Sequence, residues 1–196
     1  MQNNVDCIIL AAGLSSRMFD FKPLMLYNGM SFLENIINKT KKICNKVIVV
    51  TGYNSKLIES IIQTKYNNEK IYTVFNPEYN SSMYLSLLVG LTHVTNNNHV
   101  LYHFIDQPTI PVQFYYEFLA EIDTTSLIVQ PRYCNKRGHP LLFSFNFCKH
   151  LLNSNPDSYL KLEMKKFENE IKYWDCNYKQ ILKDFDTPED FKIIED

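Results

Sequence analysis

The fold of this protein is decided by the stretch Val5-Asp6-Cys7-Ile8-Ile9-Leu10-Ala11-Ala12-Gly13. Its run Val5–Ala11 is short, mostly apolar and rich in branched side chains, which is typical of a strand buried on both faces. Three further runs of this kind are Lys46–Thr51, Ile71–Phe75 and Val100–Ile105. The pattern predicts a sheet of buried, mostly parallel strands.

Helical segments separate these strands. Apolar residues recur at helical spacing in Ser31–Ile43, Ser55–Tyr66 and Met83–Val94. Ser31 and Glu34 have the spacing of a capping box, which places the start of the first helix. The strand–helix–strand repetition predicts an α/β fold, with a single-domain, Rossmann-like, doubly wound and mostly parallel sheet.

Beyond residue 106 the pattern is looser, but it still predicts helices and short strands. The helices are Gln113–Ile122, Tyr159–Phe167 and Pro188–Ile194, and the strands are Leu127–Gln130, Leu141–Phe143 and Ile171–Trp174. Parallel sheets bind ligands beyond the C-terminal ends of their strands. The residues that follow each strand are therefore the candidates for function.

Composition and charge exclude several classes of function. The chain has 196 residues, a length that fits one domain, and its net charge of −1 offers no electrostatic footprint for nucleic acid or an anionic membrane. It contains no apolar run of about 18 residues that could span a bilayer. The five cysteines are scattered and lack CxxC spacing, so neither a disulfide framework nor a zinc site is indicated. The polar residues Met1–Asp6 do not resemble the start of a signal peptide, and a cytoplasmic protein is expected.

The loop after the first strand has the composition of a phosphate-binding loop. Leu10-Ala11-Ala12-Gly13-Leu14-Ser15-Ser16-Arg17-Met18 is followed by Lys22-Pro23-Leu24. Small residues let backbone N–H groups approach phosphate oxygens, and Arg17 and Lys22 add positive charge. The loop is neither a Walker loop nor a GxGxxG turn. Taken alone, it is also compatible with a tight strand-to-helix connection that carries surface cations.

Two acidic segments are candidates for metal binding. Asp106-Gln107-Pro108 follows the strand Val100–Ile105, and Asp184-Phe185-Asp186-Thr187-Pro188 lies near the C-terminus. Mg²⁺ favours one or two carboxylates together with phosphate oxygens, so a carboxylate at a strand tip suits a triphosphate site. Asp106 could instead be a simple turn residue. Asp186 is also a candidate helix N-cap, and that role is compatible with metal binding.

The loop motif Leu-Ala-Ala-Gly-x-Ser-x-Arg-Met, followed by Lys-Pro-Leu, resembles the signature of small nucleotidyltransferases of the molybdenum cofactor cytidylyltransferase type. The resemblance continues through five motifs in the family's order, from Ile8 to about Phe191. It implies the nucleotide-diphospho-sugar transferase-like fold and a loop that holds the triphosphate. The nucleotide-binding residues implied here are Leu10, Ala11, Ala12, Gly13, Ser15, Ser16, Arg17 and Lys22. Phe19 replaces the family's glycine.

The remaining motifs complete the implied site. Asn76-Pro77-Glu78-Tyr79 and the segment Ser82–Ser86 are similar to the family's element against the base and ribose, which implies that Asn76 and Ser86 bind the nucleotide. Tyr79 and Ser82 replace the family's tryptophan and glycine. The loop Arg137-Gly138-His139 is similar to the acceptor-binding loop.

The resemblance also implies which residues bind the metal ion. Asp106 and Asp186 are the implied ligands of Mg²⁺, with Asp184 in a supporting or alternative role, and Ile105 replaces a glycine beside Asp106. The implied catalytic residues are Arg17, Lys22, Asp106 and Asp186.

The implied reaction transfers a nucleotide, favoured as CMP from CTP, to a phosphorylated acceptor, favoured as molybdopterin, with release of pyrophosphate. Residues 1–110 would bind the nucleotide and residues 111–196 the acceptor, and a molybdenum hydroxylase would receive the product. A sugar- or alcohol-phosphate nucleotidyltransferase remains an alternative, as does a non-catalytic nucleotide-binding accessory protein for molybdoenzyme maturation. An NAD-dependent oxidoreductase is disfavoured because the dinucleotide turn is missing.

Overall fold

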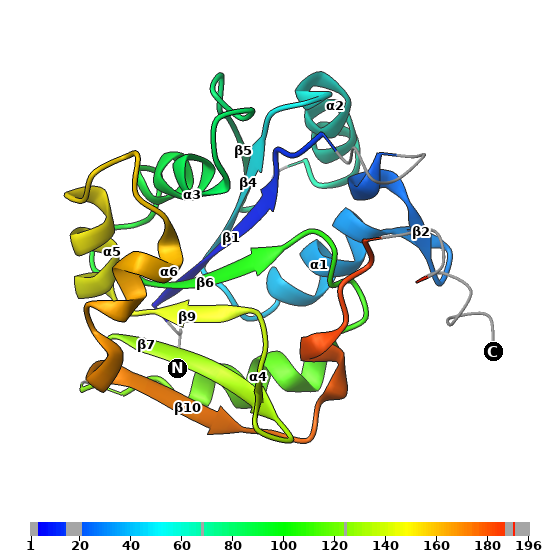
Figure 1. Ribbon diagram of the computed structural model, residues 1–196. Helices are drawn as coiled ribbons and strands as arrows, with labels where there is room; N and C mark the ends of the chain where they lie inside the picture. The colour runs from blue at the N-terminus through cyan, green and yellow to red at the C-terminus, as the bar shows by residue number, and fades with distance from the viewer. Residues whose placement is uncertain (1–3, 15–20, 68, 124, 187–189, 191–196) are drawn as a thin grey trace.

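The strands form one large sheet in the computed structural model, which describes residues 4–14, 21–67, 69–123, 125–186 and 190 (Figure 1). Its eight strands have the order β10-β7-β9-β6-β1-β4-β5, with β8 paired to β7. The strands are β1 (Val5–Ala11), β4 (Lys46–Thr51), β5 (Ile71–Phe75), β6 (His99–Phe104), β7 (Ile128–Tyr133), β8 (Lys136–Arg137), β9 (Leu141–Phe143) and β10 (Ile171–Asp175). A separate hairpin joins β2 (Leu26–Tyr27) to β3 (Met30–Ser31).

The sheet is mostly parallel, as predicted. β1 pairs in parallel with β4 and β6, β4 with β5, and β7 with β10. Only β9 and the short β8 run against their neighbours. The C-terminal ends of β1, β4 and β6 therefore meet at one edge of the sheet, where the predicted loop and Asp106 follow.

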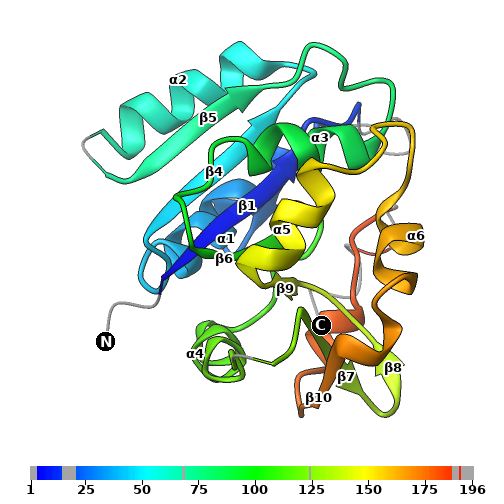
Figure 2. The ribbon, with the colours of Figure 1, turned by 90° about the vertical axis from the view of Figure 1, so that its left-hand side faces the viewer.

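Helices cover both faces of the sheet (Figures 1 and 2). They are α1 (Phe32–Thr40), α2 (Ser55–Lys65), α3 (Met83–Leu91), α4 (Val112–Ala120), α5 (Phe145–Leu152) and α6 (Leu160–Lys165), with 3-10 turns at Lys22–Leu24, Glu168–Glu170 and Lys179–Leu182. Along β1, Cys7 and Ile9 pack with α1, α2 and α4, whereas Ile8 and Leu10 pack with α3 and α5. This alternation of a strand buried on both faces makes the fold doubly wound. Within the described ranges, no helix is both long enough and apolar enough to cross a membrane.

The start of α1 confirms the predicted capping box. The backbone N–H of Glu34 donates to Ser31 Oγ at 3.2 Å, and the backbone N–H of Ser31 donates to Glu34 Oε2 at 3.1 Å. Two of the four N–H groups that lack a partner inside the helix are thereby satisfied.

The structure and the prediction differ at three elements. Helix α5 was not predicted, because its aromatic residues have no strong helix propensity; burial of Phe147 and Leu151 against the sheet decides it. β7 extends past its predicted end through Pro131, which lies beyond the last residue that pairs with β9. A proline is tolerated there because β9 no longer pairs with the strand at this residue, so no hydrogen bond to β9 requires the N–H that proline lacks. Of the predicted helix Pro188–Ile194, only Asp190 lies among the described residues.

Glu163 on α6 links this helix to α5 through a hydrogen bond with His150. The Glu163 side chain is 1% exposed. One carboxylate oxygen lies 2.7 Å from both His150 Nε2 and Lys166 Nζ, and the other accepts from Ser158 Oγ at 2.6 Å. A buried carboxylate satisfied on both oxygens fixes the position of the helix that carries it.

Replacing Glu163 with glutamine is expected to lower the free energy of unfolding at pH 7 by about 2 kcal/mol. Burial opposes ionisation of this carboxyl, but the hydrogen bonds from Lys166, Ser158 and His150 outweigh it and lower its pKa to about 2. Because this value lies below the ordinary 4.5, the ionised network stabilises the fold above pH 4.5, and that stabilisation is lost as the pH falls toward 2. Urea denaturation from pH 7 to pH 2 should therefore show a smaller loss of stability on acidification for the variant. Glu59→Gln on α2 is the control, since Glu59 has no ion-pair partner among the residues described; equal effects of the two substitutions would contradict the role of Glu163.

Candidate active site

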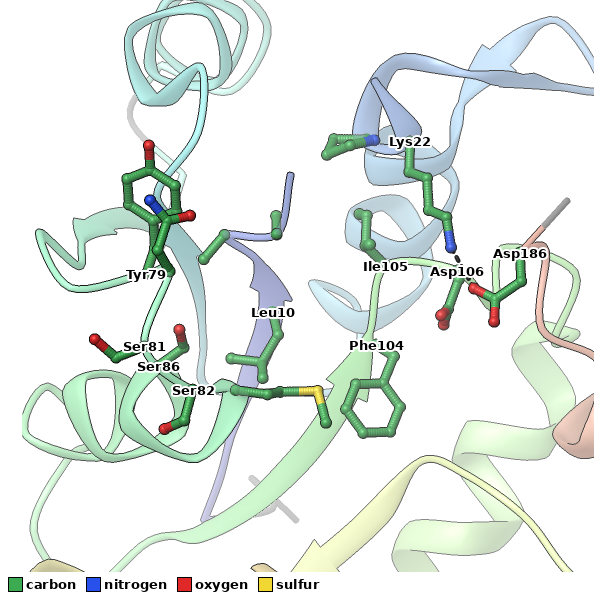
Figure 3. Close-up of a pocket in the computed structure, with 16 residues that line it drawn as sticks. Leu10, Lys22, Tyr79, Ser81, Ser82, Ser86, Phe104, Ile105, Asp106 and Asp186 are labelled. Atoms are coloured by element: carbon green, nitrogen blue, oxygen red, sulfur yellow. Dashed lines mark hydrogen bonds and ion pairs between the residues drawn. The ribbon is translucent and has the colours of Figure 1, made fainter. Parts of the chain in front are cut away.

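A cavity of about 460 Å³ opens at the C-terminal ends of β1 and β6 (Figure 3). The residues that line it are Leu10, Ala11, Ala12, Gly13, Lys22, Pro23, Tyr79, Asn80, Ser81, Ser82, Met83, Ser86, Phe104, Ile105, Asp106 and Asp186. This set contains most of the residues that the sequence predicts for nucleotide binding and catalysis. Ser15, Ser16, Arg17 and Phe19 lie outside the described residues.

The acidic side of the cavity combines the tip of β6 with a segment near the C-terminus. The backbone N–H of Phe185 donates to the carbonyl oxygen of Asp106 at 3.0 Å. The Gln107 side chain donates to Asp184 Oδ1 at 2.7 Å and to the carbonyl oxygen of Ile181 at 3.2 Å. These contacts bring Asp186 beside Asp106, although the two residues lie far apart in the sequence (Figure 3).

Lys22 lies among the carboxylates on this side of the cavity. Lys22, which is 8% exposed, forms an ion pair with Asp186. Asp106 Oδ1 is buried and has no hydrogen-bond partner in the described part of the chain. Burial, followed by the charge of Asp184, raises the pKa of Asp106 to about 6, against the opposing charge of Lys22. Asp106 is still mostly ionised at pH 7 and can accept a cation.

The carboxylates suit a divalent cation completed by substrate oxygens. The described residues contain no cluster of three or more His, Cys, Asp or Glu side chains that could hold a metal by itself. Asp106 and Asp186 supply two hard oxygen donors at one cavity wall, and the buried, unpartnered Asp106 Oδ1 is suited to a ligand. Mg²⁺ and similar ions favour this combination of one or two carboxylates with phosphate oxygens. The residues present therefore fit such an ion.

The opposite wall is formed by α3 and the segment before it (Figure 3). Ser82, which replaces the family's glycine, is the N-cap of α3 and accepts a hydrogen bond from the backbone N–H of Leu85 at 3.0 Å. Asn76 does not line the cavity; it is buried and donates to Ser86 Oγ at 3.0 Å. The geometry thus gives Asn76 contact with Ser86, which itself lines the cavity.

Gly52, at the end of β4, allows Tyr79 to form part of this wall. A Cβ at Gly52 would lie 2.4 Å from Tyr79 Cβ and 2.6 Å from the carbonyl oxygen of Ala12. We expect Gly52→Ala to lower the free energy of unfolding by about 2 kcal/mol because both neighbours must shift. Urea denaturation measures the loss, and Gly13→Ala is the control, since a Cβ there meets no atom of the described residues within 4 Å. Similar losses in both variants would mean that the close contact at Gly52 is not the cause.

A second cavity of about 840 Å³ adjoins the first and shares Ser82, Met83 and Phe104 with it. Its other lining residues are Tyr84, Tyr102, Gln130, Arg137, His139, Leu141, Tyr159, Leu160, Lys161, Met164, Lys165, Glu168, Ile171 and Tyr173. Two of the three predicted acceptor-binding residues, Arg137 and His139, are among them.

The third predicted acceptor residue, Gly138, is buried outside the cavity lining. A Cβ at Gly138 would lie 2.6 Å from Ile181 Cγ1, so this position is needed for close packing of the loop. The side chain of His139 packs edge-on against Phe104, with ring centroids 4.6 Å apart. Burial lowers the pKa of His139 to about 4, so its imidazole is neutral at pH 7.

The sequence motifs missed Tyr159, Lys161, Lys165 and Tyr173. No spacing signal marks them, because α6 and β10 reach the second cavity only through tertiary packing. Figure 2 shows α6 and β10 on the same side of the molecule as β8, the strand that carries Arg137.

Comparison with known proteins agrees with this geometry. The model of the MobA-like NTP transferase domain family matches residues 7–167. The chain is 26% identical over 187 residues to the molybdenum cofactor cytidylyltransferase of Escherichia coli strain K12, covering 95% of this chain and 93% of that protein. Among solved structures, a nucleotidyl transferase from Methanothermobacter has a TM-score of 0.80 at 18% identity, covering 97% of this chain and 95% of that one. The Rv0371c protein of Mycobacterium tuberculosis in complex with manganese has a TM-score of 0.71 at 18% identity, covering 97% of each chain. The family model covers most of this chain, and the cytidylyltransferase of Escherichia coli matches it over nearly its full length. The chain therefore belongs to the MobA-like NTP transferase domain family, and it is a nucleotidyltransferase.

Proposed function

We propose that this protein transfers CMP from CTP to a phosphorylated acceptor, which we infer to be molybdopterin, and releases pyrophosphate. One observation carries the proposal: Lys22, Asp106 and Asp186 meet at the end of a nucleotide-sized cavity that adjoins a second cavity lined by Arg137. A donor and an acceptor can therefore be bound next to each other, which is the main requirement of phosphoryl transfer.

The chain's own residues would act mainly by positioning and by charge. The backbone of Leu10–Gly13 would hold the triphosphate, and Lys22 would offset its negative charge. An oxygen of the acceptor phosphate forms a bond to the α-phosphorus as the bond to pyrophosphate breaks. This oxygen is already ionised at neutral pH, so the reaction needs no general base, and neutral His139 is free to act in binding alone.

Asp106 and Asp186 would hold the divalent cation. When bound, the cation would neutralise the charge that develops on the triphosphate oxygens. We favour Mg²⁺, and the manganese complex of the mycobacterial structure supports a choice among oxygen-preferring divalent ions. Arg17, outside the described residues, stays a proposed phosphate contact.

The acceptor is inferred from the Escherichia coli relative. A sugar- or alcohol-phosphate acceptor is the second candidate. Delivery of the product to a molybdenum hydroxylase, the division into nucleotide-binding residues 1–110 and acceptor-binding residues 111–196, and a cytoplasmic location stay predictions.

Thermal unfolding with CTP, GTP, ATP and UTP, each with and without Mg²⁺ or Mn²⁺, tests the nucleotide. A ligand at 100 times its dissociation constant adds about 2.7 kcal/mol of stability, enough to raise the Tm by several degrees. We expect a metal-dependent shift with CTP above the others, and pyrophosphate release only when molybdopterin is added. A larger shift with GTP or UTP would reassign the base. Nucleotide binding without turnover on any phosphorylated acceptor would favour the accessory-protein alternative.

A further inference from the structure

The second cavity is lined by cations from two different elements. Lys161 and Lys165 are one turn apart on the same face of α6, and Arg137 comes from β8. None of the three forms an ion pair with another described residue. Their neighbours are compensated: Lys166 pairs with Glu163, and Arg132 pairs with Asp175. Among the described residues that line the cavity, Glu168 is the one acidic residue.

Tyr173 on β10 lines the same cavity and contacts one of these cations, Arg137. The guanidinium carbon of Arg137 lies 4.6 Å from the centroid of the Tyr173 ring, a distance at which the ring attracts and orients the cation. The Tyr173 hydroxyl is buried and has no hydrogen-bond partner among the described residues, and the same holds for His139 Nδ1. Leaving two such buried polar atoms without hydrogen bonds would cost free energy, so water or a bound molecule must supply their partners, and both atoms belong to residues of one cavity.

The rest of this cavity is largely aromatic and apolar. Tyr102, Phe104, Leu141 and Met164 all line it, and Tyr159, which is 57% exposed, does so as well. Aromatic walls of this kind favour a flat ring over a branched aliphatic chain.

The positions of the lysines in the two cavities indicate which charged groups a flat-ring acceptor would carry. The acceptor's attacking phosphate has to reach the nucleotide cavity, where Lys22 and Asp106 lie. Lys161 and Lys165 line only the second cavity, so they are available to a different anionic group of the same molecule.

We propose that Tyr173, Lys161 and Lys165 complete the acceptor site, and that this site selects a flat heterocycle that carries an anionic group besides its attacking phosphate. The inference rests on the proposed function, which places the acceptor in this cavity. Tyr173 acts partly as a positioning residue for Arg137 and partly through its own hydroxyl.

Fluorescence titration of the full chain with two probes tests the selection. The probes are pterin-6-carboxylate, a flat ring with one anionic group, and pterin, the same ring without it. We expect the carboxylate to bind about tenfold more tightly. The double substitution Lys161→Gln with Lys165→Gln should abolish this difference, whereas the charge-matched control Lys56→Gln with Lys149→Gln should retain it. Equal binding of the two probes, or an unchanged preference in the α6 double variant, would overturn the proposal.

Two substitutions separate the roles of Tyr173. Tyr173→Phe keeps the ring that orients Arg137 and should weaken carboxylate binding only a few-fold, whereas Tyr173→Leu should weaken it by an order of magnitude or more. In the pyrophosphate assay with molybdopterin, both should raise the acceptor KM more than they lower kcat and leave the CTP-induced thermal shift unchanged. If CTP does not shift the Tm of the unmodified protein, the proposed function is contradicted. If CTP does shift the Tm but the protein binds the two pterin probes equally, only this inference is contradicted. Equal behaviour of the Phe and Leu variants would remove the positioning role.

Discussion

Asp106→Asn is expected to lower kcat for pyrophosphate release by roughly 10³-fold, because the substitution removes the charge that would hold the cation against the triphosphate. The fold should not suffer. Burial and the neighbouring Asp184 disfavour the ionised form of Asp106 and raise its pKa to about 6. Loss of that charge should leave the free energy of unfolding at pH 7 unchanged or slightly higher. Steady-state kinetics with CTP, together with urea denaturation, measures both effects.

Asp184→Asn is the matched control for this prediction. Asp184 accepts a hydrogen bond from Gln107 but does not line the nucleotide cavity, whereas Asp186 does. We expect its replacement to lower kcat less than about tenfold. Near-normal turnover in Asp106→Asn would remove Asp106 from the mechanism, and a loss in Asp184→Asn as large as that in Asp106→Asn would make Asp184 a metal ligand.

Lys22→Met is expected to lower kcat/KM for CTP by roughly 10²-fold, because the variant loses a nearly buried cation that, in the proposed site, would face the triphosphate. The substitution should also change the pH dependence. The charge of Lys22 holds the pKa of Asp106 down, so without it the pKa of Asp106 should rise. A smaller fraction of Asp106 is then ionised at a given pH, and the acidic limb of the pH profile of kcat/KM should move to higher pH.

Lys22→Arg keeps the charge and is the control. It should retain the position of the acidic limb and lose less kcat/KM than Lys22→Met, although the guanidinium cannot reproduce the compact ammonium geometry. Circular dichroism should show that both variants are folded. A normal kcat/KM in Lys22→Met would contradict the role of Lys22 in catalysis. The same conclusion would follow if the acidic limb of the pH profile moved equally in both variants.

Much of the fold could be predicted because its strongest signals are local. The strands Val5–Ala11 and Lys46–Thr51 have the predicted bounds, since a strand covered on both faces must be apolar along its whole length. Ile71–Phe75 also has its predicted bounds, but the expected burial on both faces is wrong for it, because it is an edge strand and Tyr72 and Phe75 are exposed. The capping box at Ser31 and Glu34 was also readable, because both partners lie within one helical turn.

Prediction failed where a local preference was weak or was overruled by packing. The aromatic residues of Phe145–Leu152 do not favour a helix by themselves; contact of Phe147 and Leu151 with the sheet decides it. Gly138 belongs to the predicted acceptor motif, but its packing against Ile181 cannot be recognised without the fold.

The sequence by itself determined the doubly wound sheet and the small-residue loop, and it placed Asp106 at a strand tip, because strand periodicity and strand–helix alternation leave signals within a few residues of each other. The family resemblance implied that Asp106 and Asp186 hold one ion, but only the tertiary structure shows the contacts that bring Asp186 beside Asp106 and pair it with Lys22, and only it places Tyr173 and the α6 lysines at the second cavity. These neighbours come from segments that are distant along the chain. Their proximity depends on how whole elements pack, and no local pattern of residues encodes it.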